Sequence, residues 1–160
     1  MKIVVAVYND WGIGQSGTQQ IVIPADRKRF LQLTDGGAVI VGRKTFEDFP
    51  GPLKNRKNVI LTRNSGYRAD GAVIVHSVSE ALDEVAGVSP DRVFVVGGGD
   101  IYRTFLPLCD FAFVTKIKAT PTSDTFFPNL DSLPEWRIEM QGDIYESNGI
   151  QYSFNEYKRC

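Results

Sequence analysis

The sequence predicts an α/β fold: a single domain over residues 1–160 with a mostly parallel central sheet flanked by helices and a C-terminal antiparallel hairpin. Short runs rich in Val and Ile recur along the first two thirds of the chain. They are continuous rather than alternating, as in strands buried on both faces. Helical patterns separate several of these runs. The last third instead holds an Asn-Gly pair between two longer strand patterns, which indicates a tight hairpin.

The strands follow from the apolar runs. Five runs are expected to form the parallel part of the sheet, at residues 3–7, 38–41, 59–61, 72–75 and 93–96, and a longer strand is expected at 111–117. Segments 136–145 and 150–157 flank Asn148-Gly149, and strands joined by so tight a turn must be antiparallel.

Four helices are expected between the strands. The first spans residues 24–34, because Pro24 suits a first turn and Gly36-Gly37 supplies the stop. A short one covers 43–47, and a third follows the capping-box pattern that begins at Ser77. The fourth follows three glycines and covers 101–106. Segment 9–23 has no regular pattern, and we expect it to be a mobile lid.

Composition excludes several classes of protein. The hydrophobic share of 42% and the charged share of 23% are ordinary for a soluble globular chain. With a net charge of -1, no global field attracts nucleic acid or a membrane. No apolar run could span a bilayer, and the N-terminal run reads as a strand, not a signal peptide. Cys109 and Cys160 fit no metal or redox spacing, so we expect no metal site and reduced thiols in a cytoplasmic protein.

Asp26 is the most informative residue. Residues four and seven positions apart share a helix face, so Asp26, Phe30 and Leu33 line one stripe, while residues 27–29 are expected on the wetter side. A carboxylate on an apolar stripe loses hydration, which raises its pKa and suits it to hold or move a proton. The alternative is that Asp26 merely complements the helix dipole.

Three strand ends carry groups suited to phosphate. Gly97-Gly98-Gly99 lies between a strand and a helix, Gly42-Arg43-Lys44-Thr45 repeats the arrangement, and Thr62-Arg63 ends a third strand. Ligands of open α/β sheets lie beyond such ends. Each feature alone is equally explained by a tight turn or a surface charge, but the three together favour a phosphate-rich ligand.

Other polar residues are ambiguous from position alone. Arg56 could pair with a carboxylate, although a solvated loop charge explains it as well. Thr115 could be an ordinary strand residue or the partner of a buried carboxylate. His76 is the single histidine and reads as a solvated junction residue, so neither a zinc site nor a Ser-His pair is supported.

Taken in order, these pieces resemble the dihydrofolate reductase family over essentially the full length. The matching segments are Trp11-Gly12-Ile13-Gly14, Ile23-Pro24-Ala25-Asp26 with Phe30, Val41 to Phe46, Leu53 with Arg56-Lys57-Asn58, Val96 to Gly99 with Tyr102, and Val114-Thr115.

The resemblance implies hydride transfer from NADPH to dihydrofolate, with Asp26 and Thr115 in the catalytic role. Asp26 would grip the pteridine and favour protonation of N5, Thr115 would orient that carboxylate, and Arg56 would pair with the glutamate tail. Folate-like inhibitors would bind in the same pocket, and a monomer is expected. The full set implied for the substrate is Val5, Ala6, Ile21, Asp26, Phe30, Phe49, Leu53, Arg56, Val96, Tyr102 and Thr115.

The same resemblance implies an NADPH site. The glycines would approach the pyrophosphate, Arg43 and Arg63 would meet the 2′-phosphate, and segment 9–23 would close over the nicotinamide. The residues implied are Ala6, Ile13, Gly14, Gly42, Arg43, Lys44, Thr45, Leu61, Thr62, Arg63, His76, Val96, Gly97, Gly98, Gly99, Asp100, Ile101 and Tyr102.

The chain departs from the family pattern in four places. Ile21 stands where many members have Trp, and Gln19-Gln20 precede it in place of an apolar residue and proline. Asp100 replaces a cation of some members, and Phe113 replaces a frequent tyrosine. Two other hypotheses therefore remain: a reductase of a ribosylated pyrimidine on the same fold, and a non-enzymatic NADPH-binding module with a decayed pocket.

Overall fold

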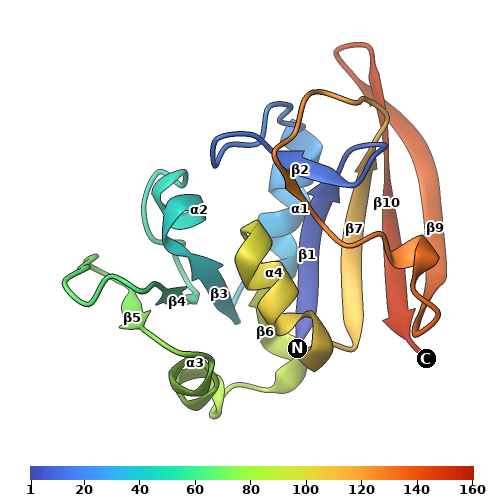
Figure 1. Cartoon of the computed structure of the whole chain (residues 1–160). Coiled ribbons are helices and arrows are strands. Elements are labelled where there is room, and N and C mark those ends of the chain that lie inside the picture. The colour runs from blue at the N-terminus through green and yellow to red at the C-terminus, as the bar shows by residue number, and fades with distance from the viewer.

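The computed structural model describes all residues, 1–160. Its centre is an eight-stranded sheet in the order β5-β4-β3-β6-β1-β7-β10-β9, and a separate two-stranded sheet joins β2 to β8. Figure 1 shows the sheet running from β5 at one edge to the long β9 at the other. The six strands from β5 to β7 are parallel, whereas β10 and β9 are antiparallel to their neighbours. The predicted mostly parallel sheet with a C-terminal hairpin is therefore confirmed.

The strands of the eight-stranded sheet begin and end close to the expected positions, whereas β2 and β8 were not predicted. Their bounds are β1 Lys2–Val7, β2 Gly12–Gly14, β3 Ala38–Gly42, β4 Lys57–Leu61, β5 Val73–Val75, β6 Val93–Val95, β7 Phe111–Ile117, β8 Thr125–Phe126, β9 Trp136–Ser147 and β10 Ile150–Arg159. Between β9 and β10, Asn148 and Gly149 have φ values of 49° and 80°. Two consecutive positive φ angles are what a type I′ turn requires, so the turn has the primed geometry that the Asn-Gly pair predicts.

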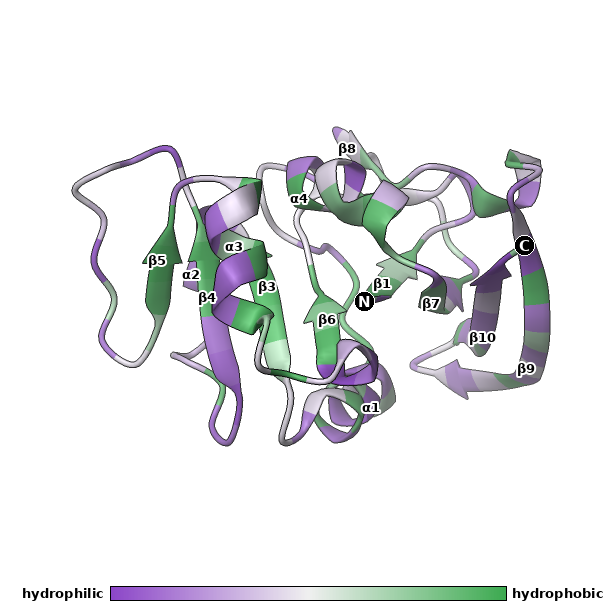
Figure 2. Ribbon diagram, turned by 90° about the horizontal axis from the view of Figure 1, so that it is seen from below, coloured by the Kyte–Doolittle hydropathy of each residue, from purple (hydrophilic) through white to green (hydrophobic).

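Four α-helices connect the strands as predicted. They are α1 Pro24–Thr34, α2 Arg43–Glu47, α3 Val78–Val85 and α4 Gly99–Phe105, with short 3-10 turns at Pro90–Arg92, Leu106–Leu108 and Leu130–Ser132. Seen along the sheet in Figure 2, α1 lies on one side, and α4 and β8 lie on the other. The glycine stop of α1 is confirmed, because Gly36 follows the helix with a φ of 76°.

The core has one layer on each side of the sheet. Alternate residues of β3 separate the layers, since Ala38 and Ile40 belong to the larger cluster with α3 and α4, and Val39 and Val41 pack with Phe46 of α2. All four of these β3 residues are fully buried. Burial on both faces explains why the central strands read as unbroken apolar runs.

The expectation that segment 9–23 lacks regular structure is wrong in part. Residues Gly12–Gly14 form β2, which pairs with β8, and Gln15 forms a bridge with Thr18. The partner strand β8 lies more than 100 residues away in the chain, so no local sequence pattern predicts the pairing. The mobility of the segment stays a prediction. No helix in the structure is both long enough and apolar enough to cross a membrane.

The capping box of α3 gives a direct test of a local prediction. Ser77 Oγ accepts a hydrogen bond of 3.1 Å from the Glu80 backbone N–H, while Glu80 Oε2 accepts from His76 N rather than from Ser77 N. We expect Ser77→Ala to lower the free energy of unfolding by about 1 kcal/mol in urea denaturation, because it leaves an N–H of the first turn without its partner. Ser79→Ala, within the same helix, is the control and should be neutral or slightly stabilising. A loss of equal size in both variants would contradict the cap.

Candidate functional site

A cleft of about 1570 Å³ opens at the edge of the sheet where the parallel strands end. A pocket for one drug-sized ligand is typically about 300–1,000 Å³, so this cleft has room for two ligands side by side. One half is walled by β1 and α1, and the other by the turns after β3, β4 and β6.

Asp26 lies in the first turn of α1 and faces this cleft. Its Oδ1 accepts a hydrogen bond of 2.5 Å from Thr115 Oγ1 on β7. Burial raises the pKa of Asp26, and the Thr115 hydrogen bond and the positive charges of Arg29 and Arg27 act against that rise. The predicted partnership of Asp26 with Thr115 is therefore confirmed. Thr115 itself is buried and lies behind Asp26, not in the lining of the cleft.

The prediction that residues 27–29 all lie on the wetter side of α1 is wrong for Arg29. Arg27 and Lys28 are exposed as predicted, but Arg29 is half-buried. Its guanidinium stacks over the ring of Phe154, with 4.5 Å between the Cζ atom and the ring centroid. Helical spacing gave the wrong prediction for Arg29, because it takes no account of the aromatic side chains of the sheet, whose faces attract a cation.

Apolar side chains form the wall opposite the carboxylate. The rings of Phe30 and Phe49 lie 6.3 Å apart, and Leu53 and Val96 belong to the same cluster. Val5 and Ala6 at the end of β1 also line the cleft. Beneath them the hydroxyl of buried Tyr102 donates to Val4 O at 2.7 Å. The result is a mostly apolar slot that also contains the Asp26 carboxylate.

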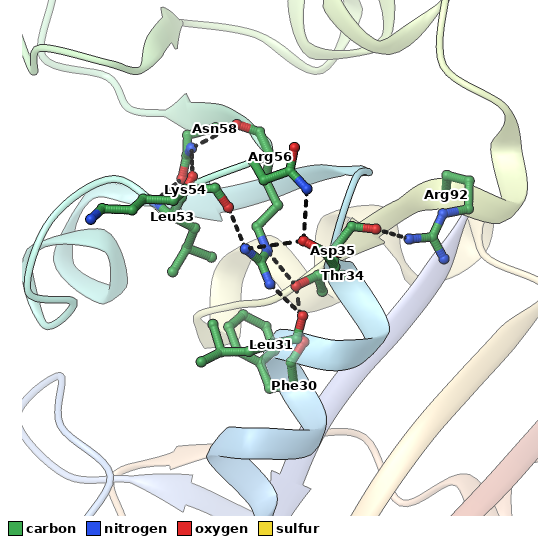
Figure 3. A network of polar contacts seen from close by, with 10 residues as sticks. Phe30, Leu31, Thr34, Asp35, Leu53, Lys54, Arg56, Asn58 and Arg92 are labelled. Atoms are coloured by element: carbon green, nitrogen blue, oxygen red, sulfur yellow. Dashed lines mark hydrogen bonds and ion pairs between the residues drawn. The ribbon is translucent and has the colours of Figure 1, made fainter.

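The structure places Arg56 outside the lining of the cleft. Figure 3 shows its guanidinium donating to Thr34 Oγ1 and to the carbonyls of Leu31 and Lys54, with Asp35 Oδ1 3.8 Å away. Its side chain is only 7% exposed, so the solvated-loop interpretation is wrong. Arg56 ties the end of α1 to the approach of β4, because α1 leaves its last carbonyls free to accept.

Ile21 also lies outside the cleft lining. Its backbone N–H donates to Tyr8 Oη at 3.0 Å, and its side chain packs beside the cluster of Tyr8, Ile23, Ile117 and Tyr152. Gln19, two residues earlier, lines the cleft instead and donates to Ile21 O at 2.8 Å. The aliphatic side chain of Ile21 is accommodated among apolar neighbours on the far side of the loop.

The glycine turn after β6 holds three backbone segments close together. Gly97 has a φ of 111°, which favours glycine, and the peptide bond between Gly97 and Gly98 is cis. A side chain at Gly98 would bring a Cβ within 3.0 Å of Thr45 Oγ1. Gly97 O accepts from Gly42 N at 2.7 Å, which joins this turn to the end of β3. Gly97, Gly98 and Gly99 all line the cleft, where they present backbone without side chains.

Basic side chains line the outer half of the cleft. The lining contains Arg43, Lys44, Arg63 and His76 as predicted, and also Arg103. Arg43 forms an ion pair of 2.9 Å with Glu47, whereas Arg63 is exposed and makes no ion pair. His76 Nδ1 lies 2.8 Å from Thr62 O. The arginines, Lys44 and the glycine turn fit a ligand that carries phosphates at two points.

Asp100 lies beside the glycine turn, where its negative charge would oppose a phosphate. Arg103 Nη2 contacts Asp100 Oδ1 at 2.5 Å and compensates that charge. Sequence reasoning missed Arg103. Its position three residues after Asp100, on the same face of α4, was the available signal.

Sequence reasoning also missed the contribution of β8 and the residue before it. Asp124, Thr125 and Phe126 line the cleft, and Asp124 Oδ2 accepts from Ser16 N at 2.9 Å. Asp124 N donates to Gly14 O at 3.0 Å, so this segment holds the loop that follows β1. Hydrogen bonds from Ser16 and then Thr125 keep the pKa of Asp124 below its ordinary value. No motif in the sequence marks these residues.

The raised pKa of Asp26 has a consequence for stability. The folded protein binds the Asp26 proton more tightly than the unfolded chain does, so this group's contribution falls as pH rises from the ordinary carboxyl pKa of about 3.9 to the raised one. We expect Asp26→Asn to unfold in urea at neutral pH at an equal or higher midpoint than the parent. The advantage should shrink as pH is lowered towards the ordinary value.

Asp124→Asn is the control of opposite sign, because the pKa of Asp124 is lowered. It should be less stable than the parent at neutral pH, and the difference should vanish in acid. An Asp26→Asn variant that is clearly less stable than the parent at neutral pH would contradict the burial of an ionised carboxylate.

Comparison with known proteins identifies the family. Residues 1–159 match the family described as dihydrofolate reductase. Among curated relatives, dihydrofolate reductase of Bacillus subtilis is 34% identical over 149 residues, which cover 92% of this chain and 87% of that protein. The bifunctional dihydrofolate reductase-thymidylate synthase of Glycine max is 36% identical over 177 residues, covering 99% of this chain and 33% of the relative. The chain thus spans about a third of the length of such bifunctional relatives.

A solved structure is also similar over nearly the whole chain. Dihydrofolate reductase from Enterococcus faecalis, complexed with NADP(H) and RAB-propyl, superposes with a TM-score of 0.86 at 31% identity, and the match covers 99% of this chain and 95% of that one. On the family match over its whole length, the sequence identity and this fold, the chain belongs to the dihydrofolate reductase family.

Proposed function

We propose that this chain reduces 7,8-dihydrofolate to 5,6,7,8-tetrahydrofolate, with NADPH as the donor of a hydride to C6 and with a proton added at N5. The observation that carries the proposal is the hydrogen bond from buried Thr115 to Asp26, a carboxylate that lines the same cleft as the glycine turn. One cleft thereby combines a carboxylate suited to hold or move a proton with a glycine turn suited to bind phosphates. The reaction consumes one NADPH and one proton and releases NADP⁺.

Asp26 has two tasks in this mechanism. Its carboxylate would accept hydrogen bonds from the amino and N3 groups of the pteridine, which fixes the ring in the slot formed by Phe30 and Phe49. The same negative charge favours the protonated imine, since an opposite charge nearby stabilises a cation. Hydride attack on C6 is easier when N5 carries that proton. The proton itself would arrive through water.

Arg56 would meet the tail carboxylate with the N–H groups that remain to it. A guanidinium has five N–H donors, and three are used by Thr34, Leu31 and Lys54, which leaves two. Leu31 and Leu53, its neighbours, line the cleft, so a carboxylate at this rim would reach the guanidinium between them. The existing contacts would hold the guanidinium plane in place for two parallel hydrogen bonds.

The outer half of the cleft fits NADPH. Gly97, Gly98 and Gly99 leave space for the pyrophosphate, and Lys44 and Thr45 stand beside them. Arg43 and Arg63 would bind the 2′-phosphate, with His76 close by. NADPH supplies the hydride when it is bound. Ala6, Ile13 and Tyr102 would frame the site of transfer, and the segment held by Asp124 would exclude water there.

The two alternative hypotheses receive less support. A decayed pocket is expected to lose the contacts that position its carboxylate, and here the contact between Thr115 and Asp26 is intact. A ribosylated pyrimidine has no carboxylate tail that could pair with Arg56, the role proposed for this residue here. We further propose a cytoplasmic monomer that binds folate-like inhibitors in the pteridine slot. Both cysteines are free thiols, which suits a reducing compartment.

The first test is an assay of turnover. The purified chain should oxidise NADPH only when dihydrofolate is present, and a folate-like inhibitor should stop the reaction. We expect Asp26→Asn to lower kcat/KM at neutral pH by about 10²–10⁴-fold, the usual contribution of a proton-transfer group, with an unchanged Kd for NADPH. Asp83→Asn on α3 removes the same charge far from the cleft and should leave turnover unchanged. Undiminished turnover in Asp26→Asn would remove Asp26 from this role.

Discrimination between the two nicotinamide cofactors gives a second test. Arg63 is exposed at the end of β4 without an ion pair, so it is free to bind a phosphate. We expect Arg63→Gln to raise KM for NADPH by about tenfold or more, since a hydrogen bond to a charged group contributes about 1.5–3 kcal/mol, and to leave KM for NADH nearly unchanged. Arg68→Gln, an exposed arginine outside the cleft lining, is the matched control. Equal effects on both cofactors would show that Arg63 does not read the 2′-phosphate.

A further inference from the structure

Arg29 occupies a seam between α1 and the sheet. Its Cζ atom lies 4.5 Å from the ring centroid of Phe154 on β10 and 5.6 Å from that of Phe113 on β7. Its Nη2 lies 3.9 Å from Glu156 Oε2, and only 20% of its side chain is exposed. Two aromatic faces and one carboxylate thus hold the guanidinium in a partly desolvated position, where its charge is weakly screened.

The same seam contains Asp26. Arg29 is three positions after Asp26, so both side chains lie on one face of α1. Asp26 contacts Thr115, whose partner across the sheet is Phe154, and Phe113 stands two residues before Thr115 on the same sheet face. The Arg29 guanidinium therefore lies one helical turn from the Asp26 carboxylate. It packs on Phe113 of β7 and Phe154 of β10, the two strands that meet at Thr115.

The other charged and titratable groups around Asp26 and Arg29 come from four elements. Arg27 of α1 is exposed, and Glu156 of β10 faces Arg29. Tyr102 of α4 is buried with its hydroxyl donated to Val4 O, and Lys2 of β1 stacks over Phe111 at 5.0 Å and Phe113 at 5.7 Å. β7 contributes only the neutral Thr115 at the carboxylate. Arg29 is the cation of this set that combines partial burial with a position one turn from Asp26.

We propose that Arg29 is a positioning residue for the candidate active site, which keeps Asp26 ionised inside the cleft and thereby sets the pH range of turnover. Glu156 balances this effect by partly neutralising the guanidinium. The attraction between the two charges follows from their location on one desolvated face, and the lower pKa that Arg29 gives the Asp26 carboxyl agrees with it. The link to turnover rests on the proposed function, whereas the electrostatic link to Asp26 does not.

The test measures the titration of Asp26 directly. Aspartate labelled with ¹³C at the carboxyl carbon is followed by NMR across the acidic and neutral range, and the Asp26 signal is identified by its loss in Asp26→Asn. We expect Arg29→Met to move the midpoint upward by about half a pH unit or more, roughly a threefold change in the protonation equilibrium. Glu156→Gln should move it downward, and Arg29→Lys should stay near the parent because the charge is kept.

Lys28→Met is the matched control, since it removes one exposed positive charge from the same helix. An unmoved midpoint in both Arg29→Met and Glu156→Gln would overturn the proposal, as would an equal shift in Lys28→Met. If Arg29 only packs α1 on the sheet, Arg29→Met lowers the unfolding temperature without moving the midpoint. If Arg29→Met does not fold, the downward shift in Glu156→Gln and the parent-like midpoint of Arg29→Lys decide the matter.

The pH profile of kcat/KM for dihydrofolate is the second measurement. The limb that belongs to Asp26 should move in the same direction as the NMR midpoint in each variant. A chain that moves its NMR midpoint but reduces no dihydrofolate would refute the proposed function and leave the role of Arg29 standing. Variants that turn over dihydrofolate with unmoved NMR midpoints would refute the role of Arg29 and leave the proposed function standing.

Discussion

A carboxylate held out of water between α1 and the sheet is the constraint on which this molecule depends. An ionised carboxylate that loses its hydration costs several kcal/mol unless hydrogen bonds and opposite charges offset that loss. Asp26 receives a hydrogen bond of 2.5 Å from Thr115 and lies on a helix that places Arg29 on the same face. The position of α1 over β7 and β10 is therefore an electrostatic arrangement as much as an apolar one.

The direction of the strands explains why the remaining groups meet that carboxylate. Because β3, β4, β6 and β1 are parallel, the segments that follow them emerge at one edge. Gly42, Thr62 and Val96 stand directly after or at the ends of such strands and share the cleft with Asp26. In the proposed reaction a hydride and a proton reach neighbouring atoms of one heterocycle, and the shared edge places the glycine turn and Asp26 in one cleft.

Local patterns in the sequence carried most of the fold. The unbroken apolar runs predicted the parallel strands, and the Asn148-Gly149 pair predicted the hairpin. Pro24 and Gly36 predicted where α1 begins and ends. Each rests on an interaction between residues close in the chain or on burial on both faces. The partnership of Asp26 with Thr115 was implied by the resemblance to the dihydrofolate reductase family, whereas the position of Thr115 in its strand left its role open.

The predictions that were wrong or missing concern residues whose contacts come from distant parts of the chain. Helical spacing alone put Arg29 on the wet side, and nothing local indicated that Phe113 and Phe154 would accept its charge. Arg56 reads as a solvated loop residue until the end of α1 is brought to it, and Asp124 shows no pattern until it meets Ser16. Segment 9–23 looks irregular because its β partner is supplied by Thr125–Phe126.

The sequence by itself determined most of the elements, their order and the acid at the start of α1, because backbone preferences and hydrophobic periodicity act over a few residues. The tertiary structure alone decided which charges face one another, which arginines are held by carbonyls or rings, and which residues line the cleft. Electrostatic attraction, hydrogen bonding and exclusion of water depend on distances in space, and residues far apart in the chain acquire those distances only when the sheet and its covering helices pack.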